Sequence, residues 1–350
     1  MEAVSMYSKR VFALALMVVL AASLTAFAAK DVTLLPGPAF DSAVTPEDSG
    51  TVKPVDIKSD RPIKIAVIGL ENNPFWIPVK EGCMAAKKEL EPLNCTVDWI
   101  NAGEQHTAEV FGPAIESAMA QGYDAIAVVA GEAGIVPFIN KAVDAGIPVA
   151  TFNVETATPN KRLFFVGCDT YQQGRAAGAA MAEVLDGKGK VAIITGFFAV
   201  EAHENRRQGF EDWLAENAPG ITVVGVVENQ DKGDIAFTQA QDFMIAYPDL
   251  DGIYVTAGGP FGAAAAVEAA RKVGKVKVVC FDFVDETMEY VAKGVITGTI
   301  GQDPYAQGHD PAVRLYNYLI GGVVPPAGRL LTASDFVTKD NMYDFWQPSN

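Results

Sequence analysis

The stretch Ile63-Lys64-Ile65-Ala66-Val67-Ile68-Gly69-Leu70-Glu71-Asn72-Asn73-Pro74-Phe75-Trp76 decides how the rest of the sequence is interpreted. It begins with an apolar, β-branched run that predicts a strand, and an amphipathic helix is expected from about Ile77. Turns from the end of a parallel strand into a helix are where open α/β sheets bind ligands. Because this turn carries two amides and two adjacent aromatic rings, we expect it to form one wall of a polar pocket with aromatic surfaces.

The alternation of strand and helix continues along the sequence in two consecutive series. The first has expected strands at 63–69, 96–101, 125–130, 149–152 and 163–167, with helices near 77–91, 107–121 and 134–145. The second has expected strands at 191–195, 222–228, 252–256, 276–281 and 297–301, with helices near 171–186, 202–217, 234–247, 260–273, 285–293 and 304–320, then a short run at 330–337. Continuous apolar strands are typical of parallel sheets covered on both faces. We therefore predict an α/β protein with two doubly wound parallel-sheet lobes that share a cleft.

The N-terminal residues 1–29 have the features of a cleaved signal peptide. Lys9 and Arg10 give a positive start, the run from Val11 to Leu20 is apolar, and Ala26-Phe27-Ala28 fits a cleavage site. A retained membrane anchor is the alternative, but the apolar run is short for a span. The formal net charge of −16 argues against nucleic acid and anionic membrane surfaces as partners. We expect an exported protein of the bacterial periplasm.

The four cysteines leave two interpretations open. Cys83 and Cys95 are near enough in sequence to form a disulfide, which export permits, or all four are buried thiols packed as small hydrophobic groups. There is no CxxC motif and no cluster of Cys and His, so we expect no metal site and no cofactor.

The residues that follow the expected strands are aromatic rings, amides, a carboxylate and an arginine, which suits a small neutral polyol. Four motifs resemble the periplasmic binding proteins of the ribose-binding type, the receptors of sugar transporters of the ATP-binding-cassette (ABC) class. They are Asn72-Asn73-Pro74-Phe75-Trp76; Gly146-Ile147-Pro148-Val149; Arg206-x-x-Gly209-Phe210; and Val278-Val279-Cys280-Phe281-Asp282 with Gln302 downstream.

This resemblance, which covers about 62–340, implies the domain organisation and the site. The lobes would be 61–168 plus 303–331 and 169–302 plus 332–345, after a poorly ordered linker at 30–60, with three hinge crossings near Cys168-Asp169, Gln302-Asp303 and Leu331-Thr332. The implied ligand-binding residues are Asn73, Phe75, Trp76, Asn153, Phe197, Arg206, Asp282 and Gln302. Structural alternatives are that Phe75 and Trp76 only fill the helix start, Phe197 packs in the core, Arg206 forms a surface salt bridge and Asp282 caps a helix.

Two turns depart from the pattern of the family. The sequence has Asn153-Val154 where the ribose-binding type has Asp-Arg, and Ala257-Gly258 where it usually has Asn-Asp. Because charged anchors for hydroxyls are lost, the ligand is expected to differ from ribose: a deoxysugar, a sugar alcohol, or a small carboxylate held by Arg206.

Other function classes find less support. A dinucleotide-binding enzyme would need Gly-x-Gly-x-x-Gly after its first strand, and Gly258-Gly259-Pro260-Phe261-Gly262 lacks the lysine of a phosphate loop. The histidines are far apart in sequence, although His203 lies near Arg206 and could face the cleft. We therefore predict a monomeric, non-enzymatic solute-binding protein that delivers a sugar-like ligand to ABC permease subunits. The alternative is a receptor for another small polar ligand, such as a small carboxylate or a signalling molecule, that feeds a sensor kinase or chemoreceptor.

Overall fold

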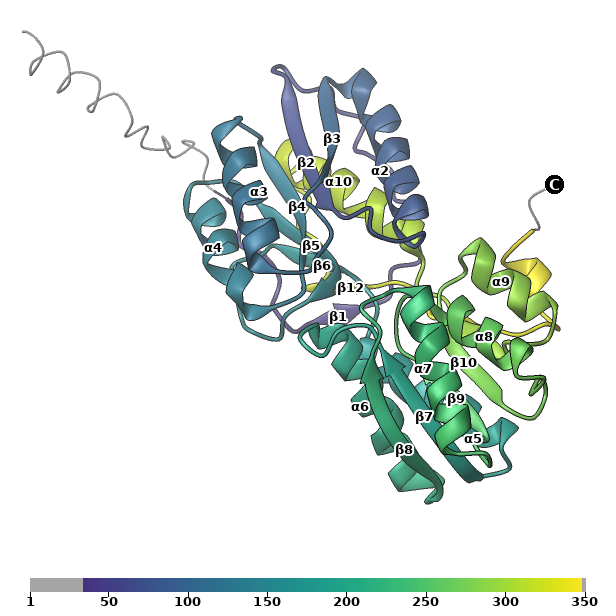
Figure 1. Cartoon of the computed structure of the whole chain (residues 1–350). Coiled ribbons are helices and arrows are strands. Elements are labelled where there is room, and N and C mark those ends of the chain that lie inside the picture. The colour runs from purple at the N-terminus through teal and green to yellow at the C-terminus, as the bar shows by residue number, and fades with distance from the viewer. Residues whose placement is uncertain (1–33, 348–350) are drawn as a thin grey trace, which may run out of the picture.

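The computed structural model describes residues 34–347, so the expected signal peptide at 1–29 lies outside the described part of the chain. The described chain forms two lobes, one above the other in Figure 1, each a sheet with helices on both faces. This confirms the predicted α/β class with two doubly wound lobes. The helices of residues 34–347 all fall short of the length and apolar character needed to cross a membrane.

The first lobe is built on a seven-stranded sheet in the order β1-β12-β6-β5-β4-β2-β3, in which neighbouring strands are parallel. Its strands are β1 (Ala43–Val44), β2 (Ile63–Gly69), β3 (Cys95–Asn101), β4 (Ala125–Ala130), β5 (Val149–Glu155), β6 (Phe164–Gly167) and β12 (Arg329–Leu331). Helices α2 (Trp76–Leu90) and α10 (Pro304–Gly321) pack together on one face, and α3 (Ala108–Ala120) and α4 (Val136–Asp144) cover the other, with the short helices η1 (Glu91–Leu93) and η2 (Ala133–Ile135) alongside.

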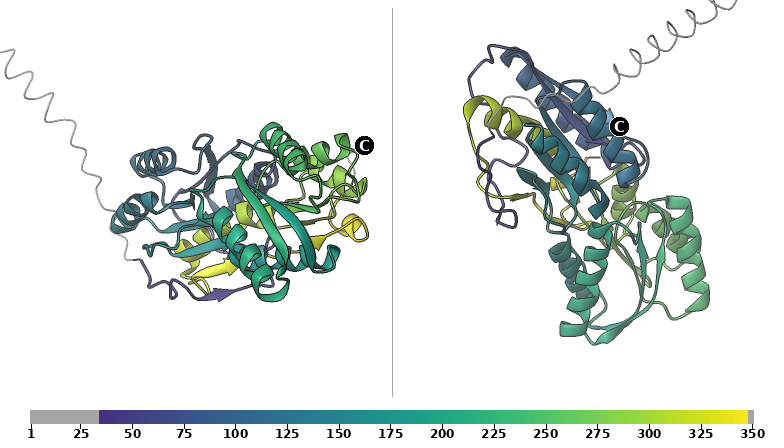
Figure 2. Two further views of the ribbon diagram at one scale, coloured as in Figure 1. Left: turned by 60° about the horizontal axis from the view of Figure 1, so that its bottom comes forward. Right: turned by 90° about the vertical axis from the view of Figure 1, so that its left-hand side faces the viewer.

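The second lobe has a six-stranded sheet in the order β13-β11-β10-β9-β7-β8, parallel except for β13. Its strands are β7 (Lys188–Thr195), β8 (Gly220–Glu228), β9 (Gly252–Val255), β10 (Lys277–Phe281), β11 (Gly298–Ile300) and β13 (Phe336–Val337). Its helices are α5 (Thr170–Val184), α6 (Glu201–Asn217), α7 (Gly233–Ala246), α8 (Pro260–Ala269), α9 (Asp285–Ala292) and η3 (Met342–Asp344). Figure 2 shows the two sheets from the side and from below.

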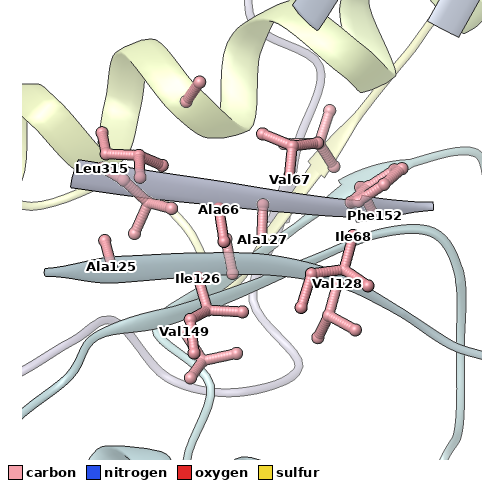
Figure 3. Packing of buried hydrophobic residues seen from close by; sticks show 14 of the residues in the cluster. Ala66, Val67, Ile68, Ala125, Ile126, Ala127, Val128, Val149, Phe152 and Leu315 are labelled. Carbon is pink, nitrogen blue, oxygen red and sulfur yellow. The ribbon is translucent and has the colours of Figure 1, made fainter. Parts of the chain in front are cut away.

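The core of the first lobe explains why its strands lack alternation. Every residue of β4 is buried, because helices cover both faces of the sheet and leave no side exposed to water. Val67 and Leu315 both lie in the layer between β2 and α10, and Ile126 points to the opposite face of the sheet, as Figure 3 shows.

Residues 34–60 differ from the poorly ordered linker that we expected at 30–60. Strand β1 pairs with β12 at the edge of the first sheet, and the Val55 backbone N–H donates to Asn317 Oδ1 of α10 at 2.8 Å. The Arg162 guanidinium lies 4.0 Å from the centre of the Phe40 ring. Periodicity could not predict this order, because the segment is held by backbone hydrogen bonds to distant elements and not by an amphipathic face of its own.

The final run also differs from the single element expected at 330–337. It is divided between β12 in the first sheet and β13 in the second, because the chain crosses between the lobes here. All four cysteines lie in the described chain, and each is an unpaired, buried thiol. Of the two interpretations left open above, the structure therefore has the buried thiols.

Candidate functional site

The turn between β2 and α2 places its aromatic pair at the face of the first lobe toward the second. Asn73 Oδ1 accepts a hydrogen bond from the Phe75 backbone N–H at 3.0 Å, which closes the turn as asparagine side chains often do. The rings of Phe75 and Trp76 meet edge to face, with centroids 5.5 Å apart. Both residues are buried: 8% of the surface of Phe75 and 2% of the surface of Trp76 are exposed to solvent. The side-chain amide nitrogen of Asn73 makes no hydrogen bond to another residue of 34–347 and remains available as a donor.

Several polar residues of the site have a left-handed backbone conformation. The φ angles of Asn153, Asp231 and Asp282 are 68°, 58° and 74°. Asn and Asp adopt this conformation more easily than other residues with a Cβ atom, yet it still costs energy. Such strain is concentrated at functional sites, where it directs a side chain that a regular strand would send elsewhere. All three lie at or just beyond the ends of strands β5, β8 and β10.

Arg206 of α6 is fixed by hydrogen bonds within the second lobe and its hinge. Its Nε and Nη2 atoms donate to Gln173 Oε1 at 3.0 and 2.9 Å, and Nη1 donates to the Thr256 carbonyl at 3.0 Å. Nη2 also donates to Gln302 Oε1 at 2.8 Å. The guanidinium stacks on the Phe281 ring at 4.0 Å from its centre. Arg206 is therefore buried and does not form the surface salt bridge considered above.

The glycine of the Arg206-x-x-Gly209 motif lets α6 approach α5. A Cβ atom at Gly209 would lie 2.2 Å from the Tyr171 carbonyl oxygen, so any other residue would push the helices apart. A Cβ atom at Gly174 of α5 would meet the Arg206 carbonyl oxygen at 2.2 Å. This close packing brings Gln173 within reach of the guanidinium.

Asp282 and Gln302 continue the network from Arg206. Gln302 Nε2 donates to Asp282 Oδ1 at 2.5 Å, so the amide joins the guanidinium to the carboxylate. Burial raises the pKa of the Asp282 carboxyl, and the nearby Arg206 partly opposes that shift. Helix α9 begins only at Asp285, so Asp282 is not its N-cap.

Of the two remaining predicted residues, Asn153 lines the cavity between the lobes and Phe197 does not. Asn153 Nδ2 donates to Gln307 Oε1 at 3.0 Å, and its Oδ1 accepts no hydrogen bond from the described residues. Phe197 does not line the cavity described below; its ring stacks on His203, with centroids 6.3 Å apart, and packs against the core of the first lobe.

Three titratable residues of the cavity were not among the predicted ligand-binding residues: His106, His203 and Asp231. The ring of His106 lies between those of Trp76 and His203, at 6.0 and 6.2 Å between centroids. His203 Nδ1 accepts from the Phe197 backbone N–H at 3.0 Å, which leaves the proton of the neutral ring on Nε2. Asp231 Oδ1 accepts from the Gly258 backbone N–H at 2.9 Å. His106 and Asp231 follow β3 and β8, two strand ends whose turns were not among those predicted to line the site.

These side chains from both lobes enclose one cavity. The space between these side chains, with the open solvent at the mouth of the cavity included, is about 370 Å³. Its lining residues are Asn73, Phe75, Trp76, His106, Asn153 and Val154 from the first lobe, His203, Arg206, Asp231, Ala257, Gly258 and Asp282 from the second, and Gln302 between them. The structure therefore brings seven of the eight predicted residues together and leaves Phe197 behind His203.

Both histidines of the cavity are neutral at neutral pH. Burial lowers the pKa of His106 to about 4 and that of His203 to about 3, with Arg206 acting in the same direction. Burial raises the pKa of the Asp231 carboxyl, while His106 and the Gly258 N–H oppose the shift. No group of three or more His, Cys, Asp or Glu side chains that could hold a metal ion occurs in residues 34–347.

The three chain segments that link the lobes are joined to one another by hydrogen bonds. Thr332 Oγ1 donates to the Gln302 carbonyl at 2.8 Å, and Cys168 Sγ lies 3.1 Å from Thr332 Oγ1. Gln307 Nε2 donates to the same Gln302 carbonyl at 2.6 Å. Gln302 also lines the cavity. This residue is therefore part of both the linking segments and the cavity wall.

The lobes also touch where the chain after β5 meets the start of α6. Glu201, at the start of α6, accepts hydrogen bonds from Thr156 Oγ1 and the Ala157 backbone N–H of the first lobe, each at 2.6 Å. Val200 and Ala202 are buried in the hydrophobic cluster of the first lobe. The two lobes are therefore in direct contact beside the cavity, as in a closed arrangement.

Comparison with known proteins gives consistent matches along most of the chain. The sequence model of a family described as "Periplasmic binding protein domain" matches residues 65–322. The chain is 26% identical to a D-ribose/D-allose-binding protein of Pseudomonas aeruginosa over 240 residues, which are 66% of this chain and 73% of the relative.

Solved structures resemble this one in fold. A glucose-galactose binding protein from Geobacillus stearothermophilus has a TM-score of 0.73 and 29% sequence identity, over 81% of this chain and 99% of that one. An ABC transporter solute-binding protein from Burkholderia graminis, solved with D-arabinose, has a TM-score of 0.76 and 26% identity, over 83% of this chain and all (100%) of that one.

Proposed function

Because this chain belongs to the periplasmic binding protein family, we propose that it is an extracytoplasmic, non-enzymatic solute-binding protein that captures a sugar or sugar-like molecule. The relatives named above bind ribose, allose, glucose, galactose or arabinose by their descriptions, which supports this ligand class. The ligand-bound form would deliver its ligand to the permease subunits of an ABC transporter. The expected signal peptide would place the mature, monomeric protein in the periplasm.

The observation that carries this proposal is the cavity enclosed by both lobes. Phe75 and Trp76 offer ring surfaces on which the apolar C–H face of a sugar can pack. Asn73 and Asn153 supply a free amide donor and a free amide acceptor for hydroxyls, while Asp282 accepts from them. An affinity in the micromolar range needs about 8 kcal/mol, which a few such hydrogen bonds with ring burial can provide.

Binding would act through the equilibrium between open and closed lobes. A ligand that contacts both walls of the cavity interacts with the closed form more strongly than with the open form, so it shifts the population toward closure. We propose lobes of 61–168 plus 303–331 and of 169–302 plus 332–345, hinged at the three bonded segments. Gln302 would report ligand binding to the hinge, because its side chain lines the cavity and its carbonyl holds the crossing segments.

A small carboxylate is less well supported than a polyol. Arg206 was the residue expected to hold it, but four hydrogen bonds already engage this guanidinium. A guanidinium has five N–H donors, so one N–H remains for a ligand and a bidentate carboxylate complex cannot form without breaking the network.

A thermal-shift screen of the mature protein against neutral sugars, polyols and small carboxylates tests this proposal. A ligand at 100 times its Kd stabilises the folded protein by about 2.7 kcal/mol, so hits can be confirmed by calorimetry. We expect hits among polyhydroxylated compounds and none among carboxylates. Stabilisation by carboxylates alone would contradict the proposal. Sugar binding without an uptake defect on deletion would favour the alternative, a receptor for a sensor kinase or chemoreceptor.

A further inference from the structure

We infer that the cavity is built for a polyol that carries a protonated amino group, and not for a wholly neutral sugar. This inference rests on the proposed function, because it assigns the ligand class of the same cavity. It follows from the charges, the free acceptors and the rings that the two lobes bring together.

The first argument is charge. Two carboxylates, Asp231 and Asp282, line the cavity, and Arg206 is its one residue with a permanent positive charge. Arg206 is engaged by Gln173, Thr256 and Gln302, so it stays in place and offsets one negative charge at most. The cavity therefore retains one unbalanced carboxylate. A buried charge without a partner is costly, and a cationic ligand group would supply the partner.

The second argument is the set of groups left free to contact a ligand. Asp231 and Asp282 each use only Oδ1 in hydrogen bonds to the described residues, so both Oδ2 atoms remain available. Asn153 uses only its Nδ2 nitrogen, which leaves Oδ1 as a further acceptor. An ammonium group has three donors and no acceptor, so its hydrogen-bonding needs match this excess of acceptors.

A buried polar atom without a partner provides an independent indication of a ligand. His106 is 7% exposed, it lines the cavity, and its Nδ1 has no hydrogen-bond partner among the described residues. Buried polar atoms almost always have a partner. A hydrogen-bonding group on a ligand in this cavity would satisfy this nitrogen.

The histidines do not remove the need for a cation. Burial holds the pKa of His106 at about 4 and that of His203 at about 3, so neither ring is charged at neutral pH. The remaining way to balance the cavity without a cation is to protonate Asp231 or Asp282, whose pKa values burial raises. Ligand selectivity distinguishes these two cases, because a protonated carboxyl would not prefer an amine over a hydroxyl.

The aromatic wall suits the same ligand. The ring of Trp76 lies in the cavity beside His106, and a cation near the face of a tryptophan is stabilised by the ring. The C–H groups of a cyclic polyol would pack on the same surface.

Calorimetry on the mature protein at pH 7 with matched ligands tests the inference. The probes are amino-deoxyhexoses and amino-cyclitols, each with its hydroxyl parent and its N-acetyl derivative, which lacks the charge. We expect at least one amine to bind at least tenfold more tightly than both of its matched compounds. If a hydroxyl parent binds as tightly as every amine, the inference is wrong and the proposed function stands. If no compound binds to the folded protein, both are wrong.

Asp231→Asn supplies the test within the protein. Asparagine keeps the oxygen that accepts from Gly258 and removes the charge, so the fold should be retained. We expect the affinity for the amine to fall at least tenfold more than the affinity for its hydroxyl parent. Asp234→Asn, at an exposed position of α7, is the matched control and should leave both unchanged. Equal losses for amine and parent in Asp231→Asn would overturn the inference.

Discussion

The two walls of the cavity are built in different ways. The wall from the first lobe consists of rings and amides that make few hydrogen bonds to each other, with Phe75 and Trp76 in edge-to-face contact. The wall from the second lobe is a connected network in which Arg206, Gln302 and Asp282 hold one another. The difference predicts that the first wall would supply a surface for many cyclic polyols, while the second would fix charge and select among them.

The largest effect is expected from removing the centre of the network. Arg206→Met would leave Gln173, Gln302 and the Thr256 carbonyl without their donor and Asp282 without its cation. Loss of one partner from a buried charged network costs about 3–5 kcal/mol, which urea denaturation would measure. Arg175→Met, which removes an exposed ion pair with Glu216, is the control and should cost less than about 1 kcal/mol. Equal losses in both variants would show that the network does not stabilise the second wall.

The second-largest effect, on ligand affinity, is expected from removing the Trp76 ring of the first wall. Trp76→Leu keeps an apolar side chain at the start of α2 but removes the ring surface of the cavity. We expect a loss of at least tenfold in affinity for every polyol that binds, about 1.4 kcal/mol, measured by calorimetry. Trp213→Leu removes a ring that packs in the core of the second lobe, away from the cavity, and should leave affinity unchanged. A loss restricted to one ligand would contradict the view that this wall is unselective.

Acidification should weaken closure because it charges the histidines where the walls meet. In the open form both rings would meet water with ordinary pKa values near 6.5, whereas in the closed form they are about 4 and 3. Below pH 6.5 the open form therefore takes up protons that the closed form does not, and closure is disfavoured. Asp231 and Asp282 act in the opposite direction, because burial raises their pKa values.

We expect affinity for a neutral polyol to fall severalfold between pH 7.5 and 5.5, and His106→Asn to reduce this fall. Titration calorimetry across this range measures both. An affinity that is independent of pH, or one that rises on acidification, would show that the carboxyls outweigh the imidazoles.

The smallest effect is expected outside the cavity. Glu201→Ala removes the two hydrogen bonds with which α6 holds Thr156 and Ala157 across the lobes. These bonds exist only in the closed form, so the open form gains population and affinity falls about fivefold, near 1 kcal/mol. Solution scattering should show a more extended protein without ligand. Glu268→Ala, in α8 of the second lobe, should change neither quantity.

Sequence reasoning was most successful where one physical pattern dominated. The strands buried on both faces, such as β4, were visible as continuous apolar runs. The turn at Asn73 was visible because an amide and two rings at a strand end have a direct chemical meaning. His106 and Asp231 were missed because the turns after β3 and β8 carry no aromatic residue. They reach the cavity only through the arrangement of two lobes in space.

The direction in which a side chain points could not be predicted from the sequence either. Phe197 follows the end of β7 and was therefore predicted to contact the ligand, yet its ring packs on His203 behind the cavity. Arg206 was correctly placed at the cavity, but its four hydrogen bonds go to three acceptors in three separate segments. Its availability to a ligand could therefore be judged only from the structure.

The pairing of β1 with β12 has a consequence for how the chain folds as it is made. Ser42, beside β1, accepts a hydrogen bond from the Gly328 backbone N–H, 286 residues later in the sequence. Helix α10, which covers the first sheet, also comes from the last part of the chain. Synthesis proceeds from the N-terminus, and contacts between distant residues form late. The first lobe thus begins early in the chain but cannot be completed before β12 has been synthesised, so the nascent protein stays incompletely folded until most of it has been made.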